Sequence, residues 1–380
     1  MLIDYETLKL IWWVFVGLLL IGFALTDGFD MGVGALLPFL GKNDEERRVI
    51  INSIGRTWEG NQVWFITAAG AIFAAWPIVY AVAFSGFYIA LLLALFALFF
   101  RPVGFDYRSK LQNPRWRSTW DWGLFIGGVV PALIFGIAFG NLLQGVPFHF
   151  DNELRAYYTG SFWGLLNPFA LLAGVISLSM LVMHGAVYLQ LRTEDVIYVR
   201  SQKAVKFFGG LLIITFALAG VWVAVGIDGF KVISMPPLDA LPNPLAKSVE
   251  MVPGAWMSHY EMTPWTMLIP GFAFVGAFLT ILLSHFNAPG RAFISSSATL
   301  VCVILTAGVS MFPFIMPSST QPDSSLIVWD ASSSHLTLTI MFWVTVILVP
   351  LIVLYTSWVY RVLRGKITVQ YIRENEYSSY

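Results

Sequence analysis

Residues 10–40 read LIWWVFVGLLLIGFALTDGFDMGVGALLPFL, an apolar run whose only charged side chains are Asp27 and Asp30. A run of this kind predicts a transmembrane helix, because a span needs about 20 mainly apolar residues. The two carboxylates lie three residues apart, which places them on one face of a helix. A carboxylate at membrane depth is costly, so it normally has a partner and faces the protein interior or a hydrated path.

The composition of the whole chain is that of a polytopic membrane protein. Of the 380 residues, 57% are hydrophobic and 12% are charged, whereas soluble domains carry about 25% charged residues. The net charge is zero, and the sequence has no basic patch of the kind that nucleic acid requires. We therefore expect a membrane protein without a nucleic-acid partner.

Nine segments meet the requirements of a membrane span. They cover about residues 9–40, 54–75, 78–103, 119–145, 162–191, 205–227, 264–285, 292–316 and 336–363. We predict an all-α polytopic protein that forms one integral membrane domain over residues 1–380. Nine spans suit two four-helix bundles and one further helix, with the first bundle over about 9–145 and the second, with the extra helix, over about 162–363.

Basic residues in the loops predict the orientation, because cytoplasmic loops carry an excess of Lys and Arg. The loops after the first, third and fifth spans and the carboxyl-terminal tail are rich in them, and the alternate loops hold few. The amino terminus is thus expected outside and the carboxyl terminus in the cytoplasm. The longest outside connection, Asp228 to Thr263, is rich in Pro and Gly and is expected to be a surface loop with short helices.

The first span is long enough to tilt or break. Gly28, Gly32 and Gly34 surround its two aspartates, and paired small residues of this kind are places where helices kink. These glycines would allow a local unwinding of the helix near Asp27 and Asp30.

With this orientation, the ionisable residues of the first four spans all fall in the cytoplasmic half of the membrane. Asp27 and Asp30 lie past the bilayer centre, Glu59 opens the second span beside Asn61 and Gln62, Arg101 ends the third, and Asp121 begins the fourth. One interpretation is structural, in which Asp30, Arg101 and Asp121 form an ion-pair cluster that joins helices. The other is a hydrated proton route from the cytoplasm, for which Glu59 and Asp27 are the better candidates.

His184 is the one histidine well inside a predicted span. It is a candidate for polar packing, for the proton path or for an axial ligand, and the residues leave these three roles open. The chain has no Cys-x-x-Cys-His motif and no His-x-x-x-His pair. We expect no metal site in this chain, so that any redox metal would belong to a partner.

Several motifs together resemble subunit II of the cytochrome bd quinol oxidases, most closely the long-chain proteobacterial members. They are Trp12-Trp13 and residues 26–34 (TDGFDMGVG), 58–64 (WEGNQVW), 84–88 (FSGFY), 99–108 (FFRPVGFDYR), 139–147 (FGNLLQGVP) and 311–319 (MFPFIMPSS). No single motif is decisive, but the ordered set extends over nearly the whole chain.

The resemblance implies an electrogenic quinol:oxygen oxidoreductase of the aerobic respiratory chain, which oxidises ubiquinol or menaquinol and reduces dioxygen to water without pumping protons. Two haems b and one haem d are expected on a partner, subunit I, in a heterodimer that small single-helix accessory subunits can join. The expected location is the bacterial inner membrane, with the amino terminus in the periplasm. Some members bind a quinone in subunit II, so a ubiquinone bound by this chain is a further expectation, without contact residues assigned.

Carried over by position, the family's intramembrane charge cluster matches Asp30, Arg101 and Asp121. Its cytoplasmic channel-mouth carboxylate matches Glu59, where many members have Asp. Glu59, Asp27 and His184 are therefore the expected proton path, and no residue of this chain is expected to be catalytic. Two alternatives stay open: a proton-coupled secondary transporter, whose carboxylates would suit broken helices, and a purely structural assembly subunit.

Overall fold

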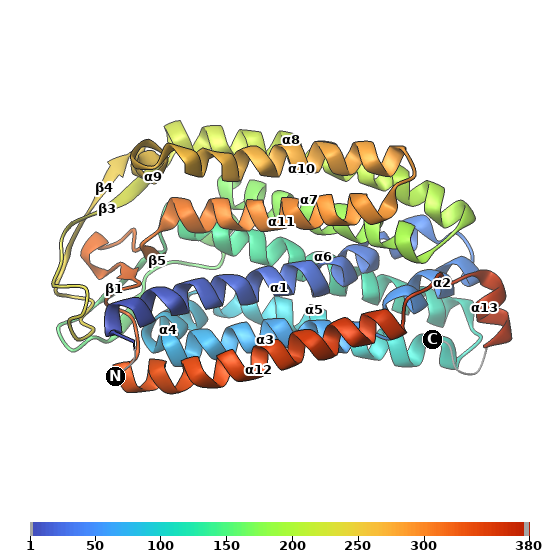
Figure 1. The fold of residues 1–380 in the computed structure, drawn as a ribbon, viewed down its shortest axis with the longest axis horizontal. Helices are drawn as coiled ribbons and strands as arrows, with labels where there is room; N and C mark the ends of the chain where they lie inside the picture. Colours follow the sequence, from blue (N-terminus) through green and yellow to red (C-terminus); the bar gives the residue numbers. More distant parts are fainter. Residues whose placement is uncertain (1–2, 376–379) are drawn as a thin grey trace.

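The computed structural model describes residues 3–375 and residue 380, and it is a bundle of long helices that run nearly side by side (Figure 1). Its α-helices are α1 Tyr5–Leu40, α2 Asp44–Ile54, α3 Trp58–Ala75, α4 Pro77–Gly86, α5 Tyr88–Tyr107, α6 Pro114–Gln144, α7 Pro168–Arg192, α8 Asp195–Gly226, α9 Ser258–Met262, α10 Leu268–His285, α11 Pro289–Met311, α12 His335–Val362 and α13 Val369–Glu374. The strands form three antiparallel pairs: β1 Phe148–Phe150 with β2 Ala156–Tyr158, β3 Asp228–Ser234 with β4 Ser248–Pro253, and β5 Phe314–Met316 with β6 Leu326–Ile327.

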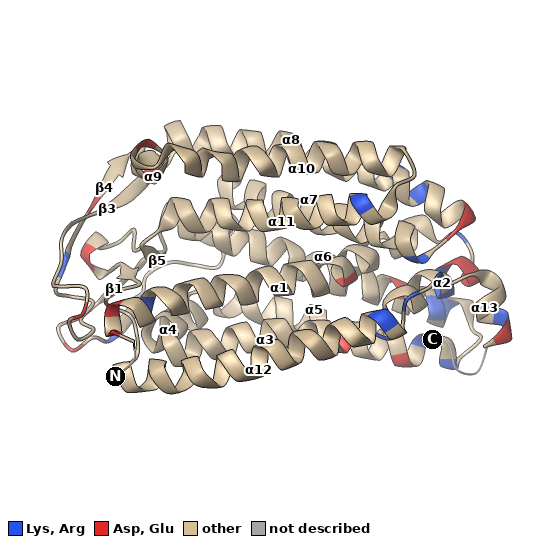
Figure 2. Cartoon of the chain, in the orientation of Figure 1, with Lys and Arg blue, Asp and Glu red and all other residues tan. Residues whose placement is uncertain are grey.

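The bundle has two different ends. We call the end that carries the strands, α9 and the first residues of α1 the strand end, and the end that carries α2, α13 and Tyr380 the α2 end (Figure 1). Charged residues gather at these two ends, and most of the Lys and Arg lie at the α2 end (Figure 2). The bundle is therefore polar at its ends and apolar between them, as a membrane-spanning protein must be.

The predicted all-α polytopic fold is confirmed. Among the described residues, eight helices are long and apolar enough to cross a membrane, and α3 with α4 adds a ninth if the two are counted as one bent span. The bend of 120° between α3 and α4 falls at Trp76-Pro77, where the sequence placed a helix end. The division into two bundles stays a prediction.

Two parts of the chain differ from the sequence expectation. The segment expected as a loop after the first span contains α2, which begins with an Asn43 cap and three acidic residues and buries Val49, Ile50 and Ile51. The segment Asp228 to Thr263, expected as a loop with short helices, also forms the β3–β4 hairpin. Both elements are short and depend on packing against the bundle, so that their local sequence signal is weak.

The local unwinding that the glycines of the first span would allow does not occur, because α1 is continuous from Tyr5 to Leu40. Its glycines allow other helices to approach. A Cβ atom at Gly32 would lie 2.1 Å from the carbonyl oxygen of Leu181 on α7, and one at Gly128 of α6 would lie 2.4 Å from the carbonyl oxygen of Met31. Small residues permit such backbone contacts between membrane helices, and α1 is thereby buried from Asp27 to Leu37.

Substitution of Gly32 by Ala is expected to destabilise the fold by about 1–3 kcal/mol, because the added methyl group overlaps the backbone of α7. Gly17 on the same helix is the matched control, since a Cβ atom there has no neighbour within 4 Å. Gly17→Ala should be neutral or slightly stabilising. Thermal denaturation of the detergent-solubilised protein measures both, and equal melting temperatures for the two variants would contradict the close approach.

Candidate functional site

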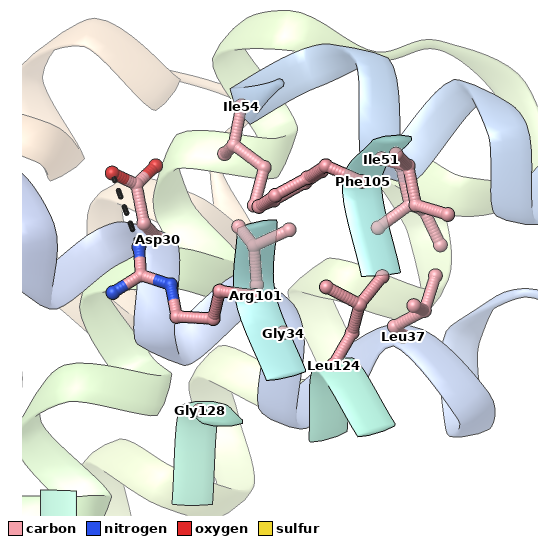
Figure 3. Close-up of a pocket in the computed structure, with 11 residues that line it drawn as sticks. Asp30, Gly34, Leu37, Ile51, Ile54, Arg101, Phe105, Leu124 and Gly128 are labelled. Carbon is pink, nitrogen blue, oxygen red and sulfur yellow. Dashed lines mark ion pairs between the residues drawn. The ribbon is translucent and has the colours of Figure 1, made fainter. Parts of the chain in front are cut away.

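Four polar side chains from three helices meet inside the bundle, and we call them the inner cluster: Asp27 and Asp30 of α1, Asn61 of α3 and Arg101 of α5. The Arg101 guanidinium donates two hydrogen bonds to Asp27, of 2.8 Å to Oδ2 and 2.5 Å to Oδ1. Asp30 is farther away, with 3.9 Å between its Oδ2 atom and Nη2 of Arg101 (Figure 3). All four side chains are buried.

Local packing explains how an arginine reaches this depth. A Cβ atom at Gly127 of α6 would lie 2.9 Å from Cγ of Arg101, so that the missing side chain leaves room for the arginine stem. Trp58 covers the guanidinium, with 5.6 Å between Cζ and the ring centroid, and Trp58 stacks in turn on Phe105. The charge is therefore held by one bidentate carboxylate and one aromatic face.

The pairing within the cluster differs from the one expected. Asp30 was the expected partner of Arg101, but Asp27 makes both short hydrogen bonds. Asp30 instead accepts a hydrogen bond of 2.7 Å from Nδ2 of Asn61. Spacing alone could not separate the two aspartates, because residues three apart share one helix face and the rotation of α1 against α5 decides which one faces Arg101.

Asp121, the third member of the expected ion-pair cluster, lies in a separate group near the α2 end. Its carboxylate accepts a hydrogen bond of 2.6 Å from Nε of Arg108 and one of 2.8 Å from Nη1 of Arg47. Arg108 also contacts Asp44, which pairs with Arg117 at 2.5 Å. We call these five residues the outer cluster.

Three of the outer-cluster residues belong to segments that were expected to be cytoplasmic loops. Arg47, Arg108 and Arg117 served only to orient the chain, although Arg108 follows Arg101 by seven residues. Seven residues are about two helical turns, so that Arg108, directly after the end of α5, follows the same helix face as Arg101. The seven-residue spacing from Arg101 was the feature of the sequence that could have indicated a buried role for Arg108.

Glu59 is exposed in the first turn of α3. Asn61, two residues later, is buried and connects three helices, because its Oδ1 atom accepts a hydrogen bond of 2.5 Å from the Tyr360 hydroxyl of α12 while its amide donates to Asp30. Nothing in the local sequence could indicate Tyr360, which lies about 300 residues further along the chain.

His184 is fully buried on α7 and both of its ring nitrogens are bonded. Nδ1 lies 2.8 Å from Oγ of Ser296, and Nε2 lies 3.1 Å from the carbonyl oxygen of Leu25. The ring stacks on Phe293, with 4.7 Å between centroids. These bonds leave neither nitrogen free for a metal, and the described residues hold no group of three His, Cys, Asp or Glu that could bind one.

A large apolar cavity of about 590 Å³ lies between α1, α6, α7, α8, α10 and α11. Polar groups occur near one edge, where the Tyr260 hydroxyl of α9 lies 3.0 Å from Oγ of Ser310. The lining includes no His and no Cys, and its three methionines, Met180, Met257 and Met267, would need a histidine partner to give the Met/His ligation found in cytochromes. Its size and apolar walls are typical of a site for an organic ligand.

Comparison with known proteins places the chain in one family. Residues 8–363 match the family described as "Cytochrome bd terminal oxidase subunit II". The chain is 57% identical to cytochrome bd-I ubiquinol oxidase subunit 2 of Escherichia coli over 379 residues, which is 100% of both chains. It is 54% identical to a probable cytochrome oxidase subunit 2 of Haemophilus influenzae, again over 100% of both.

More distant matches agree. Cytochrome bd ubiquinol oxidase subunit 2 of Bacillus subtilis is 30% identical over 94% of this chain and 96% of its own. The structure of bd oxidase from Geobacillus thermodenitrificans shares the fold, with a TM-score of 0.69 and 15% identity over 94% of this chain and 99% of that one. The chain is thus a member of the cytochrome bd terminal oxidase subunit II family.

Proposed function

We propose that this chain is the haem-free subunit of a bd-type quinol oxidase, which oxidises ubiquinol and reduces dioxygen to water in aerobic respiration. The observation that carries the proposal is the 57% identity with the E. coli ubiquinol oxidase subunit over both full lengths. A secondary transporter is not favoured, because the named relatives are oxidase subunits. The activity is assigned to the complex and not to the chain alone.

The haems of the complex, two haems b and one haem d, are assigned to the partner, subunit I. The donor groups of this chain support that division, since His184 uses both nitrogens within the protein and the large cavity offers methionines but no His or Cys in its lining. Haem supplies the redox chemistry when bound. The two subunits form a heterodimer, and small single-helix accessory subunits or lipid can cover α12, whose side chains are mostly exposed.

The proposed location is the bacterial inner membrane, with the α2 end in the cytoplasm. The concentration of Lys and Arg at that end supports this orientation (Figure 2). Glu59, Asp27 and Arg101 then lie on the cytoplasmic side of the bilayer, and the large cavity extends to Tyr260 near the periplasmic side.

Within this orientation, we assign to the chain a proton route from the cytoplasm. Glu59 is its entrance, because it is exposed and stands two residues before Asn61, which contacts Asp30. Asp27 lies one helical turn further along α1. His184 continues the series of polar groups, since it binds the carbonyl oxygen of Leu25, two residues before Asp27.

The division of labour between the subunits can be tested directly. The complex purified with its partner is expected to show haem absorption and to take up oxygen when ubiquinol is supplied. The isolated chain is expected to show neither property, because its intramembrane histidine, His184, already bonds within the protein at both ring nitrogens. Stoichiometric haem bound by the isolated chain, seen in its absorption spectrum, would contradict the assignment.

In the complex, Glu59→Gln is expected to lower ubiquinol-driven oxygen uptake by about tenfold or more, because an amide cannot pass on a proton. Haem content should stay at the wild-type value, since the Glu59 side chain is exposed. Glu59→Asp keeps the acid and should retain most of the activity.

Glu45→Gln is the matched control for this measurement. Glu45 is another partly exposed carboxylate at the α2 end, where it pairs with Arg373. Unchanged oxygen uptake is expected for it. If Glu59→Gln also left turnover unchanged in a haem-loaded complex, the chain would be a structural subunit and the proton route would be wrong.

We also assign the large cavity to a ubiquinone. Its volume of about 590 Å³ and its Phe-rich walls suit a prenylated ring, and Tyr260 and Ser310 offer hydroxyl groups to a quinone oxygen. Burial raises the pKa of Tyr260, so that its hydroxyl remains a hydrogen-bond donor at neutral pH.

Ala307→Phe is expected to reduce the ubiquinone that co-purifies with the complex, because Ala307 of α11 lines the cavity and a phenyl group would fill part of it. Ala298→Phe on the same helix is the control, since Ala298 is exposed. Extraction of the purified complexes and chromatography of the quinones gives the comparison. Equal ubiquinone in both variants would exclude this cavity.

A further inference from the structure

The charges of the inner cluster do not balance if both of its aspartates are ionised. Asp27 and Asp30 would contribute two negative charges, and Arg101 contributes one positive charge, which its two short hydrogen bonds direct to Asp27. The side chains of Asp27 and Asp30 are 0% exposed, and the side chain of Arg101 is 3% exposed. An uncompensated charge at such a site carries a large desolvation cost.

The contacts of Asp30 are too few for a buried carboxylate. Oδ2 accepts one hydrogen bond from Asn61, and the 3.9 Å to Arg101 is longer than a hydrogen bond. Oδ1 is buried and has no hydrogen-bond partner among the described residues. Asp121 gives the comparison within the same molecule, because it is equally buried and both of its oxygens accept hydrogen bonds from arginines.

We propose that Asp30 is a neutral carboxylic acid, which stores one proton beside a fixed Asp27–Arg101 ion pair. The bound proton makes the inner cluster neutral and removes the need for a second counter-charge. The path by which that proton leaves Asp30 is the proton route proposed above, and in this respect the assignment rests on the proposed function. It also distinguishes the resting states of the two aspartates along the route: Asp27 is ionised and paired with Arg101, and Asp30 carries a proton.

Asn61 is suited to both protonation states of Asp30. Its amide can donate from Nδ2 to a carboxylate, as it does here, or rotate so that Oδ1 accepts from a carboxylic acid. The Tyr360 hydroxyl on the other side of Asn61 can donate or accept in the same way. Tyr188 of α7 is the remaining titratable group near Asp30, in addition to Asp27, Arg101 and Tyr360.

There is also room for the hydrogen of the acid. A small cavity of about 10 Å³ is lined by Asp30 and Arg101 and otherwise by apolar residues that include Ile51 and Ile54 of α2 (Figure 3). Such a volume corresponds to about one water molecule. A water there could accept a hydrogen bond from the carboxylic acid of Asp30, which lines this cavity.

The experiment compares Asp30→Asn with Asp121→Asn in the purified complex. An amide mimics a neutral acid, so the melting temperature of Asp30→Asn should stay within about 2 °C of the wild type. Asp121→Asn makes the same change at an equally buried aspartate that pairs with two arginines, and it should lower the melting temperature by about 5 °C or more. If Asp30→Asn failed to assemble, or fell as far as Asp121→Asn, the proposal would be overturned.

Infrared spectroscopy of the same samples gives an independent readout. The difference between wild type and Asp30→Asn should contain the carbonyl band of a protonated carboxylic acid, which shifts in heavy water. Bands of an ionised carboxylate alone would overturn the proposal even if the variant were stable. Because neither measurement uses turnover, a failure of the proposed proton route would leave this result unaffected.

Discussion

The ion pair between Arg101 and Asp27 is the interaction on which the interior of the bundle depends. A guanidinium cannot remain at this depth without an anion, and a bidentate carboxylate is its most complete partner. The pair joins α1 to α5 and sets the rotation of α1, because both hydrogen bonds must form at once. Asp30 then points towards α3, where Asn61 donates a hydrogen bond to it. The charge state of the whole cluster follows from this one contact.

Close packing of α1 makes that contact possible. The backbones of α1 and α7 meet at Gly32, and those of α1 and α6 meet at Gly128, at distances that exclude any side chain. Among the described residues, the side chains that bond to the two aspartates come from α3 and α5, and Tyr360 of α12 bonds in turn to Asn61. Buried polar networks of this kind require every member to be satisfied, which makes the free oxygen of Asp30 the exception in the site.

The chain also separates two kinds of interior. Towards the α2 end the helices enclose charged residues in two clusters, whereas the cavity of about 590 Å³ is apolar apart from a few hydroxyl groups such as those of Tyr260 and Ser310. One part suits protons, and the other suits an apolar ligand with few polar atoms. Membership of the oxidase subunit II family gives both parts a place in one complex, in which oxygen chemistry is assigned to the partner.

Sequence alone determined the class of the fold, the approximate spans, the break at Trp76-Pro77 and the presence of acids inside the membrane, because apolar length, proline and charge are local properties. It could not decide that Asp27, rather than Asp30, pairs with Arg101, that Asp121 belongs with Arg108, or that Tyr360 reaches Asn61. It also could not decide between unwinding and helix contact for the glycines of α1, which serve helix contact. Those outcomes depend on helix rotation and on neighbours distant in the chain, and only the packed tertiary structure specifies them.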